Sequence, residues 1–318
     1  MKSNKTNLTK ILLNSFTCVG LTLASASAFA AQPRYTFGMV THAQTGDTFW
    51  DIVRKGAEAA AKKDDVKLVY AGSPTASGEA ALITNMVQQH VDGLAITLAF
   101  PDAEAASVKQ AEQAGIPVVG FNAGVGDWKA QNLLMYVGQD ETIAGQAVGT
   151  KLNEEGVTSA ICVDQQQGAV QLQARCDGIK DTFKGTLKIL YVNGYDMADA
   201  QARMVAELQQ NPDTGYIVTL GAPFAPTAVQ AVSLANSKAK VGTFDLTPLV
   251  AHLVASGKVQ WAVDQQPYVE GYEAVDLLWL YKTNGDVVGG GGPILTGPAF
   301  VTKDNVADVL KFAARGTR

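Results

Sequence analysis

The chain is poor in cysteine and histidine, the two residue types that most often carry catalysis and metal binding. Its 318 residues include three of each, and none of them have the spacing of metal ligands. The sequence also lacks the phosphate-binding pattern G-x-x-x-x-G-K-[ST], a G-x-G-x-x-G turn after its first expected strand, and the nucleophile elbow of hydrolases. We therefore expect no metal site, no cofactor and no enzyme activity.

Two glycine-rich segments are present, but neither has the form of a nucleotide site. The segment GVGDW at 124–128 lacks a third glycine and follows the fourth expected strand, and GGGGP at 289–293 is expected to be a flexible loop. An α/β enzyme of the dehydrogenase type therefore remains compatible with the topology described below, but no motif favours it.

Positive charge is scarce too, because the chain has 25 Lys and Arg against 30 Asp and Glu. Three of these lysines lie in residues 1–30, which have the pattern of a secretory signal: basic MKSNKTNLTK, apolar ILLNSFTCVGLTLAS, and the small-residue cleavage site AFA. The alternative is a membrane anchor, but the apolar run is short and is interrupted by Asn14 and Ser15. We expect cleavage after Ala30 and a periplasmic protein that does not itself span the membrane.

Without those three lysines the chain has 22 basic and 30 acidic residues, a net charge of −8. A basic surface for nucleic acid is therefore not expected. Hydrophobic residues make up 47% of the chain and charged residues 17%, which is a globular composition, and the length suggests two domains.

Two cysteines remain after the signal, Cys162 and Cys176. They fall at the end of an expected strand and inside the following helix, so a disulfide between them is geometrically possible. An oxidising compartment would allow the bond to form. The alternative is a pair of buried free thiols.

Short apolar runs alternate with helical patterns along the whole chain. Strands are expected near 35–40, 66–71, 93–98, 116–121, 158–163, 187–192, 215–220, 240–244 and 259–263. The segments between most of them have apolar residues three and four apart, which is typical of helices. Such alternation predicts α/β architecture in which helices cover both faces of parallel sheets.

The two halves of the chain also resemble each other. DGLAITLA at 92–99 matches TGYIVTLG at 214–221, and VVGFNA at 118–123 matches KVGTFDL at 240–246. The first pair is offset by 122 residues and the second, counted from Asn122 to Asp245, by 123. A nearly constant offset predicts two similar doubly wound domains.

Polar and aromatic residues stand at the carboxyl ends of these strands, where open parallel sheets bind their ligands. Phe49 follows the first strand, Asn122 ends the fourth, and Asp245 ends its counterpart. Two facing sheet edges would form a cleft lined by amides, carboxylates and aromatic rings, which suits a neutral polyhydroxylated ligand. The three histidines are expected to be packing or surface residues, and His42 alone lies near this cleft.

Several segments make the chain resemble the periplasmic monosaccharide-binding proteins of the ribose- and galactose-binding type, which serve ATP-driven (ABC) sugar importers. These are GDTFWDIVRKGAEAAAKK, VDGLAIT, AGIPVVGFNA, GQDE, GTFDL and WAVDQQPYVEGYEA, and the resemblance spans Tyr35 to about Thr302. It implies the type I periplasmic binding protein fold, with two α/β domains joined by a hinge of three crossovers near Gly138, Gln265 and Thr296–Gly297. The implied domains are 34–138 plus 266–296, and 139–265 plus 297–318.

The resemblance also implies a set of ligand-binding residues. They are Asp47, Phe49, Trp50, Asn122, Gln173, Arg175, Tyr195, Asp245 and Gln265. Departures from the ribose-binding pattern are Ala123 and Gln173, where that pattern has arginines, and Gly221, where it has asparagine. These departures argue against ribose and favour another sugar or a polyol.

Other roles remain open for some of these residues. Asp47 fits the N-cap of the first helix equally well, one of Phe49 and Trp50 is expected to pack inward, and Asn122 and Asp245 also suit turns. Three further amides, Gln165, Gln166 and Gln167, lie near a strand end of the second half without a basis for choosing among them.

The function that follows is capture of a small neutral sugar or polyol by a monomeric exported protein, which closes around it and delivers it to the membrane permease of an ABC importer. A ligand-sensing protein that binds a furanose-like signal or serves a chemoreceptor would use the same fold. A repressor core of the lac repressor type is disfavoured because a signal peptide stands where the DNA-binding segment would be.

Overall fold

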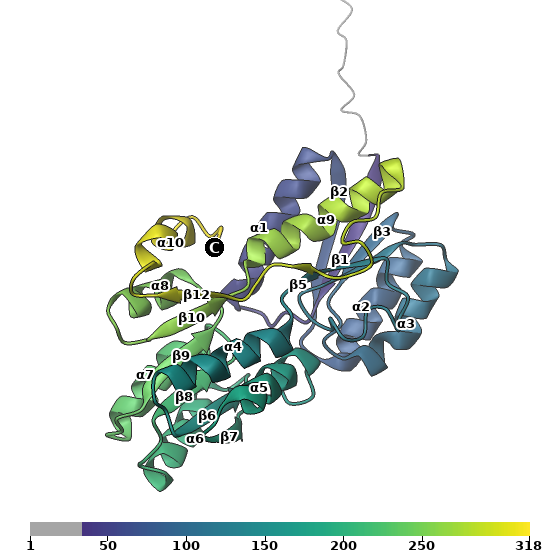
Figure 1. Cartoon of the computed structure of the whole chain (residues 1–318). Helices are drawn as coiled ribbons and strands as arrows, with labels where there is room; N and C mark the ends of the chain where they lie inside the picture. Colours follow the sequence, from purple (N-terminus) through teal and green to yellow (C-terminus); the bar gives the residue numbers. More distant parts are fainter. Residues whose placement is uncertain (1–33) are drawn as a thin grey trace, which may run out of the picture. The chain divides into compact units, whose positions relative to one another are not determined.

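The computed structural model describes residues 34–318, and the predicted signal segment 1–30 lies outside them. The described strands form two six-stranded sheets (Figure 1). Sheet A has the order β11-β5-β4-β3-β1-β2 and sheet B the order β12-β10-β9-β8-β6-β7. All pairs are parallel except β10 with β12, so the predicted α/β class with two similar sheets is confirmed.

The strand bounds show where each sheet begins and ends along the chain. Sheet A contains β1 (Tyr35–Thr41), β2 (Val66–Gly72), β3 (Gly93–Ile96), β4 (Val118–Phe121), β5 (Met135–Gly138) and β11 (Ile294–Leu295). Sheet B contains β6 (Ser159–Asp164), β7 (Thr186–Tyr191), β8 (Tyr216–Thr219), β9 (Lys240–Phe244), β10 (Trp261–Asp264) and β12 (Ala299–Thr302). The main chain therefore passes between the sheets after β5, after β10 and between β11 and β12. The domain boundaries drawn from the sequence stay a prediction.

Helices cover both faces of each sheet. On sheet A, α1 (Thr48–Lys63) and α9 (Pro267–Asn284) lie side by side on one face, with α2 (Ala76–Gln88) and α3 (Pro101–Gln113) on the other (Figure 1). On sheet B, α4 (Glu141–Glu154) and α5 (Val170–Thr182) cover one face. The other face packs against α6 (Met197–Gln210), α7 (Phe224–Leu234), α8 (Pro248–Ala255) and α10 (Val306–Ala313). No described helix has the length and apolar character needed to cross a bilayer.

Burial on both faces explains why the central strands are mostly apolar. In β1, Phe37 and Met39 belong to the core under α1 and α9, whereas Val40 belongs to the core under α2 and α3. Successive side chains of a strand point to opposite faces, and all of Phe37 to Thr41 in β1 are buried. Each such large side chain stabilises the fold by about 1.5–3 kcal/mol.

Glycines allow the closest helix pair of each sheet to approach. A Cβ on Gly56 of α1 would lie 2.0 Å from the Tyr268 carbonyl oxygen of α9, and one on Gly145 of α4 would lie 2.3 Å from the Arg175 carbonyl oxygen of α5. These contacts leave no room for a side chain. The second contact also fixes the position of α5 against α4 at Arg175. Arg175 belongs to the site described below.

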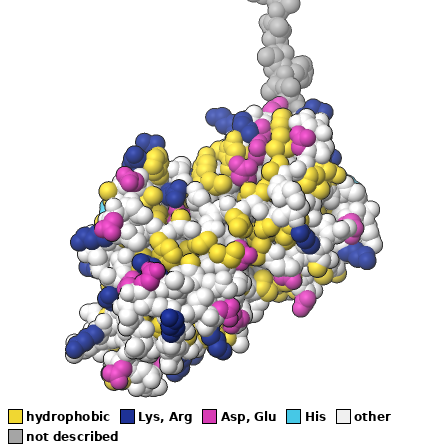
Figure 2. Space-filling model, viewed as in Figure 1, with side chains coloured by type: hydrophobic (Ala, Val, Ile, Leu, Met, Phe, Trp, Pro, Cys, Tyr) yellow, Lys and Arg dark blue, Asp and Glu magenta, His cyan; other side chains and the backbone are white. Residues whose placement is uncertain are grey.

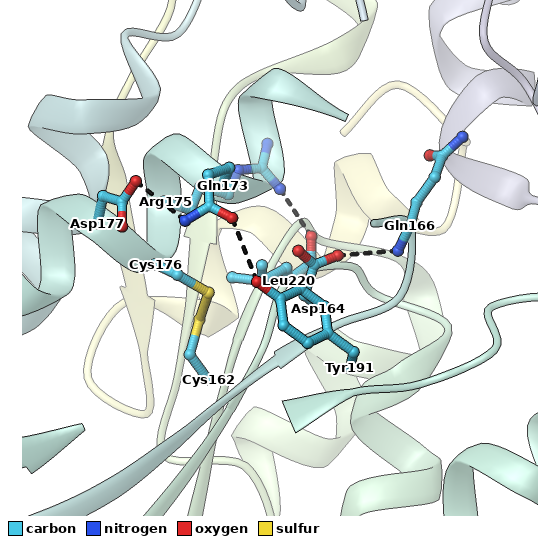
Figure 3. The surroundings of a disulfide bond; sticks show 9 residues. All are labelled: Cys162, Asp164, Gln166, Gln173, Arg175, Cys176, Asp177, Tyr191 and Leu220. Carbon is cyan, nitrogen blue, oxygen red and sulfur yellow. Dashed lines mark hydrogen bonds between the residues drawn. A yellow bond between two sulfur atoms is a disulfide. The ribbon is translucent and has the colours of Figure 1, made fainter. Parts of the chain in front are cut away.

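A disulfide joins Cys162 of β6 to Cys176 of α5, with sulfur atoms 2.02 Å apart (Figure 3). Both cysteines are fully buried in the core of sheet B. The predicted bond is therefore present, and it ties α5 to the strand beneath it.

Breaking this disulfide is expected to lower the free energy of unfolding by about 3 kcal/mol, because the bond closes a short loop and restricts the unfolded chain. The cysteines are 14 residues apart in sequence. Urea unfolding with and without reductant measures the loss. The Cys162→Ala/Cys176→Ala double variant is the control, since reductant should leave its midpoint unchanged. An equal effect of reductant on both proteins would show that the bond is not the cause.

Candidate functional site

The carboxyl ends of strands from both sheets surround a cavity of about 80 Å³. At about 10–15 Å³ for each enclosed water molecule, that volume suits a compact solute of one small ring rather than an oligosaccharide. Its walls come from both halves of the chain. They are His42, Gln44, Asp47, Phe49, Trp50, Pro74, Asn122, Gln165, Gln166, Gln171, Leu172, Arg175, Gly194, Tyr195, Leu220, Gly221, Pro223, Phe224, Asp245 and Gln265.

Eight of the nine predicted site residues lie together in this wall. They are Asp47, Phe49, Trp50, Asn122, Arg175, Tyr195, Asp245 and Gln265. Their contact with a ligand stays a prediction, but the structure brings them to one cavity from segments more than 200 residues apart.

Gln173 is the exception, and its prediction as a lining residue is wrong. It donates from Nε2 to Asp177 Oδ2 at 3.0 Å and accepts from Tyr191 Oη at 3.5 Å, on the exposed side of α5 (Figure 3). The reason is helix phase: Gln171, Leu172 and Arg175 share the face that meets the cavity, and a residue two positions before Arg175 points away from it.

Asn122 and Asp245 hold matching places in the two sheets. Each follows the end of its strand with a left-handed backbone, φ 64° and 67° respectively. Each N–H donates to the neighbouring strand, Asn122 to the Val137 carbonyl at 3.0 Å and Asp245 to the Val263 carbonyl at 2.8 Å. Left-handed non-glycine residues are uncommon and gather at functional sites, and here the conformation accompanies the presence of both side chains in the cavity wall.

Gln265 links these two residues across the sheets. Asn122 Nδ2 donates to Gln265 Oε1 at 3.2 Å, and Gln265 Nε2 donates to Asp245 Oδ1 at 2.5 Å. Asn122 Nδ2 also donates to Glu270 Oε2 at 2.9 Å, and Thr296 Oγ1 donates to Glu270 Oε1 at 3.1 Å. Gln265 and Thr296 stand where the chain passes between the sheets, so this buried network connects the crossovers to the cavity.

Arg175 carries positive charge in the cavity wall, and that charge is already neutralised. Its Nε and Nη2 donate to the two carboxylate oxygens of Glu141 at 2.6 and 2.8 Å, and Nη1 donates to the Leu220 carbonyl at 2.7 Å. Asp245 Oδ2 lies 3.9 Å from Nη1. Burial disfavours the charged guanidinium, but Glu141 and Asp245 outweigh it, so the pKa of Arg175 lies above its usual value.

Aromatic rings supply the apolar part of the wall. Phe49 and Trp50 both line the cavity and both belong to the core of sheet A. Each therefore contributes to the cavity wall and to the packing of the core. Their rings meet edge to face at 5.1 Å. From the second half, Phe224 and Tyr195 complete the apolar surface, and Tyr195 Oη donates to the Pro74 carbonyl at 3.1 Å.

Asp47 combines the two roles that its sequence position suggested. Its carboxylate accepts from the Phe49 backbone N–H at 2.9 Å and so caps α1, and it also lines the cavity. Burial raises the pKa of the Asp47 carboxyl.

Sequence reasoning missed or left undecided twelve of the twenty wall residues. Gln165 and Gln166 line the cavity, whereas Gln167 does not. His42 and Gln171 also line it. The signal for His42 was its place just past β1, but no pattern in the sequence distinguished Gln171 from its neighbours on α5.

Three buried carboxyls make the stability of the protein depend on pH. Burial raises the pKa of Glu270 to about 8 and that of Asp245 to about 7, and it raises the pKa of Glu104 of α3 to about 7. The folded state therefore binds more protons than the unfolded chain above pH 4. Burial, together with Arg175, lowers the pKa of His42 to about 3, which acts in the opposite direction but only below about pH 6.5.

Between pH 6.5 and pH 8 the carboxyls dominate, and the free energy of unfolding is expected to fall by about 3 kcal/mol. Urea unfolding at the two pH values measures the change. Glu270→Gln removes the carboxyl whose pKa is raised to about 8 and should flatten part of the profile. A stability that is constant or rises over this range would contradict the expectation.

Two features of the described residues bear on metal ions and on charge. Residues 34–318 contain no group of three or more His, Cys, Asp or Glu side chains arranged to hold a metal ion. On the face of these residues that Figure 2 shows, Lys and Arg are dispersed among acidic side chains rather than gathered in one patch.

The fold, the cavity between two sheet edges and the sequence together define a class. Residues 37–286 match the family model described as periplasmic binding protein domain, and the chain belongs to this family. It is thus a solute-binding protein of the kind that works with transporters.

Individual relatives support the same class. A crystal structure of a carbohydrate transporter from Acidothermus cellulolyticus 11B in complex with myo-inositol is 55% identical and superimposes with a TM-score of 0.89, covering 90% of this chain and 100% of that one. A xylose/arabinose-binding protein of Sulfolobus acidocaldarius is 25% identical over 87% of this chain and 73% of its own length. A ribose import binding protein of Bacillus subtilis is 22% identical over 80% of this chain and 83% of its own length.

Proposed function

We propose that this protein captures a cyclic polyol or monosaccharide of the size and chemistry of myo-inositol and presents it to the permease of an ABC importer. The observation that carries the proposal is the composition of the cavity wall. It combines amides and carboxylates from both sheets with aromatic rings, and its arginine is fully paired.

These groups suit a neutral ligand with many hydroxyls. Asp47 and Asp245 accept hydroxyl hydrogens, and the amides of Gln165, Gln171 and Gln265 offer donors and acceptors in fixed places. Because Arg175 is bound to Glu141, no free cation remains in the wall to balance a phosphate or a sugar acid. The C–H faces of a ring would pack on Phe49, Trp50 or Phe224.

The relatives narrow the ligand further. The 55% identical protein was crystallised with myo-inositol, whereas the xylose/arabinose and ribose binders are far less similar. Ala123 and Gly221 stand where the ribose-binding pattern has arginine and asparagine, which is consistent with a ligand other than ribose. A side chain on Gly221 would lie 3.0 Å from Gln165 Nε2, so the glycine leaves that amide free.

Capture by closure is supported by hydrogen bonds that cross the cavity mouth. Gln166 Nε2 and Tyr195 Oη, from the second half, both donate to the Pro74 carbonyl of the first half, at 2.8 and 3.1 Å. These contacts would break if the two sheets moved apart at the crossovers. The proposal includes export with cleavage after Ala30, action as a monomer in the periplasm, and domains divided as the sequence predicts.

Ligand binding is expected to raise the melting temperature by at least about 5 °C. One millimolar myo-inositol with a Kd of about 1 µM would add about 4 kcal/mol to the free energy of unfolding. A thermal-shift panel of inositols, pentoses and hexoses, with inositol phosphate as the charged control, ranks the ligands. The proposal fails if no neutral sugar or polyol shifts the transition, and its claim of neutrality fails if the phosphate shifts it most.

A further inference from the structure

Gln171 lines the cavity, and its side chain carries a buried acceptor without a partner. Its side chain is buried, with 5% of the residue exposed, and its Nε2 lies 3.0 Å from Nε2 of His42. Its Oε1 is buried and has no partner in the protein. A buried carbonyl oxygen without a partner is costly, so this atom is a candidate for a contact with ligand.

Behind His42, hydrogen bonds continue into the core of sheet A. Thr97 Oγ1, just past the end of β3, lies 3.0 Å from His42 Nδ1 and accepts from the His42 backbone N–H at 3.0 Å. The same hydroxyl donates to Glu79 Oε1 of α2. Thr97 is fully buried and does not line the cavity.

The far end of this chain is a pair of buried carboxyl groups. Glu79 and Glu104 are both completely buried, and the Oε2 atom of neither has a hydrogen-bond partner. Glu104 Oε1 accepts from the Phe100 backbone N–H at 3.1 Å, and Glu79 Oε1 accepts from the Thr97 hydroxyl.

Glu79 determines which atom is the donor in each hydrogen bond of this chain. Thr97 has one hydroxyl hydrogen and gives it to Glu79, so its oxygen can only accept from His42. His42 must therefore carry its hydrogen on Nδ1, and a neutral ring then has a lone pair on Nε2. Gln171 must place its NH₂ group against that lone pair, which turns its carbonyl oxygen away from His42.

We propose that Glu79, Thr97 and His42 position the Gln171 amide so that its carbonyl oxygen accepts a hydrogen from a ligand hydroxyl. The proposal rests on the proposed function and deepens it, because it assigns one hydroxyl donor of the ligand to one atom. His42 is on the first half of the chain and Gln171 on α5 of the second, so this orientation is completed when the two halves meet.

The surroundings of the His42 ring agree with a neutral imidazole. Arg175 is the charged group that acts on it, Trp50 meets it edge to face at 4.7 Å, and Gln171 and Thr97 occupy its two nitrogens. Burial first, and the positive charge of Arg175 second, lower the pKa of His42 to about 3.

The tautomer is tested directly by ¹⁵N NMR of histidine-labelled protein, with His42→Phe to identify the signal. The expected spectrum at pH 8 has hydrogen on Nδ1 and a bare Nε2. A ring with hydrogen on Nε2 would overturn the proposal. This measurement needs no ligand, so it stands even if the choice of myo-inositol is wrong.

The effect on binding is tested with two variants at a position outside the cavity. Thr97→Val keeps the shape but removes the hydroxyl, and it should weaken myo-inositol binding about 10-fold, equivalent to about 1.4 kcal/mol. Thr97→Ser keeps the hydroxyl and should restore affinity to within about 3-fold of the wild type. Unchanged affinity in Thr97→Val, with wild-type binding intact, would refute the positioning role.

A second pair of variants, on α5, tests the same contact in case Thr97→Val does not fold. Gln171→Met removes the acceptor in the cavity wall and should also weaken binding about 10-fold, whereas Gln173→Met, on the exposed side of the same helix, should not. Equal affinities in these two variants would refute the contact. If the wild-type protein itself binds no sugar or polyol, the proposed function fails, and the NMR result alone then decides the tautomer.

Discussion

Replacing Arg175 with methionine is expected to lower the free energy of unfolding by about 3–5 kcal/mol and to abolish ligand binding. The guanidinium is almost fully buried, with 4% of its side chain exposed, and Glu141 is equally buried at 3%. Removing one partner leaves the other as an uncompensated charge in the interior, which is the costly way to break a buried pair. Binding would be lost as well, because Arg175 holds the Leu220 carbonyl and faces Asp245 in the cavity wall.

Two controls separate the loss of the ion pair from the loss of packing. Arg203→Met breaks an exposed pair with Asp199 one turn away on α6 and should cost less than about 1 kcal/mol. Adding Glu141→Leu to Arg175→Met removes both charges and should recover part of the lost stability. Urea unfolding of the four proteins is the measurement. A small loss in Arg175→Met, or a further loss on adding Glu141→Leu, would contradict this account.

Replacing Asp245 with asparagine is expected to weaken myo-inositol binding about 10- to 100-fold while the protein stays folded. The carboxylate can accept charge-assisted hydrogen bonds from ligand hydroxyls, each contributing about 1.5–3 kcal/mol, whereas the amide offers a weaker acceptor. Asparagine keeps the volume, tolerates the left-handed backbone at φ 67°, and can still accept from Gln265. The effect should therefore fall on affinity rather than on the fold.

Calorimetric titration at pH 7.5 measures the affinity, and circular dichroism checks the fold. Asp213→Asn, an exposed position before β8, serves as the matched control and should bind like the wild type. An unchanged affinity in Asp245→Asn would remove this residue from the site. Trp50→Ala would be a less selective test, because Trp50 also packs in the core of sheet A and its loss would reduce stability too.

Much of the fold could be predicted because each sheet is buried on both faces. Apolar runs such as the one at β1, and the repeated spacing of β3 with β8 and β4 with β9, require nothing beyond local periodicity and the internal repeat. The strand β5 and the last elements, β11, β12 and α10, were not predicted individually. Strands as short as Ile294–Leu295 have too few residues to show a period, and their pairing depends on distant parts of the chain.

The site was predictable where a residue stands at a strand end, and less so where it stands on a helix. Asn122 and Asp245 can be identified from the sequence because each directly follows the end of an apolar strand. The structure places both at these strand ends. On α5 the choice between Gln173 and Arg175 depended on the rotation of the helix, which the contact with α4 at Gly145 and the Cys162–Cys176 disulfide fix. The hydrogen bond of His42 with Gln171 joins residues 129 apart, and no local pattern contains that information.

The central claim is that the cavity between the two sheets binds a neutral cyclic polyol or monosaccharide. Titration of the wild-type protein with myo-inositol in a calorimeter tests it most directly. We expect one site per chain with a Kd of about 1 µM or below, corresponding to about −8 kcal/mol. The absence of binding heat and of competition for myo-inositol and for every pentose and hexose tried would contradict the claim.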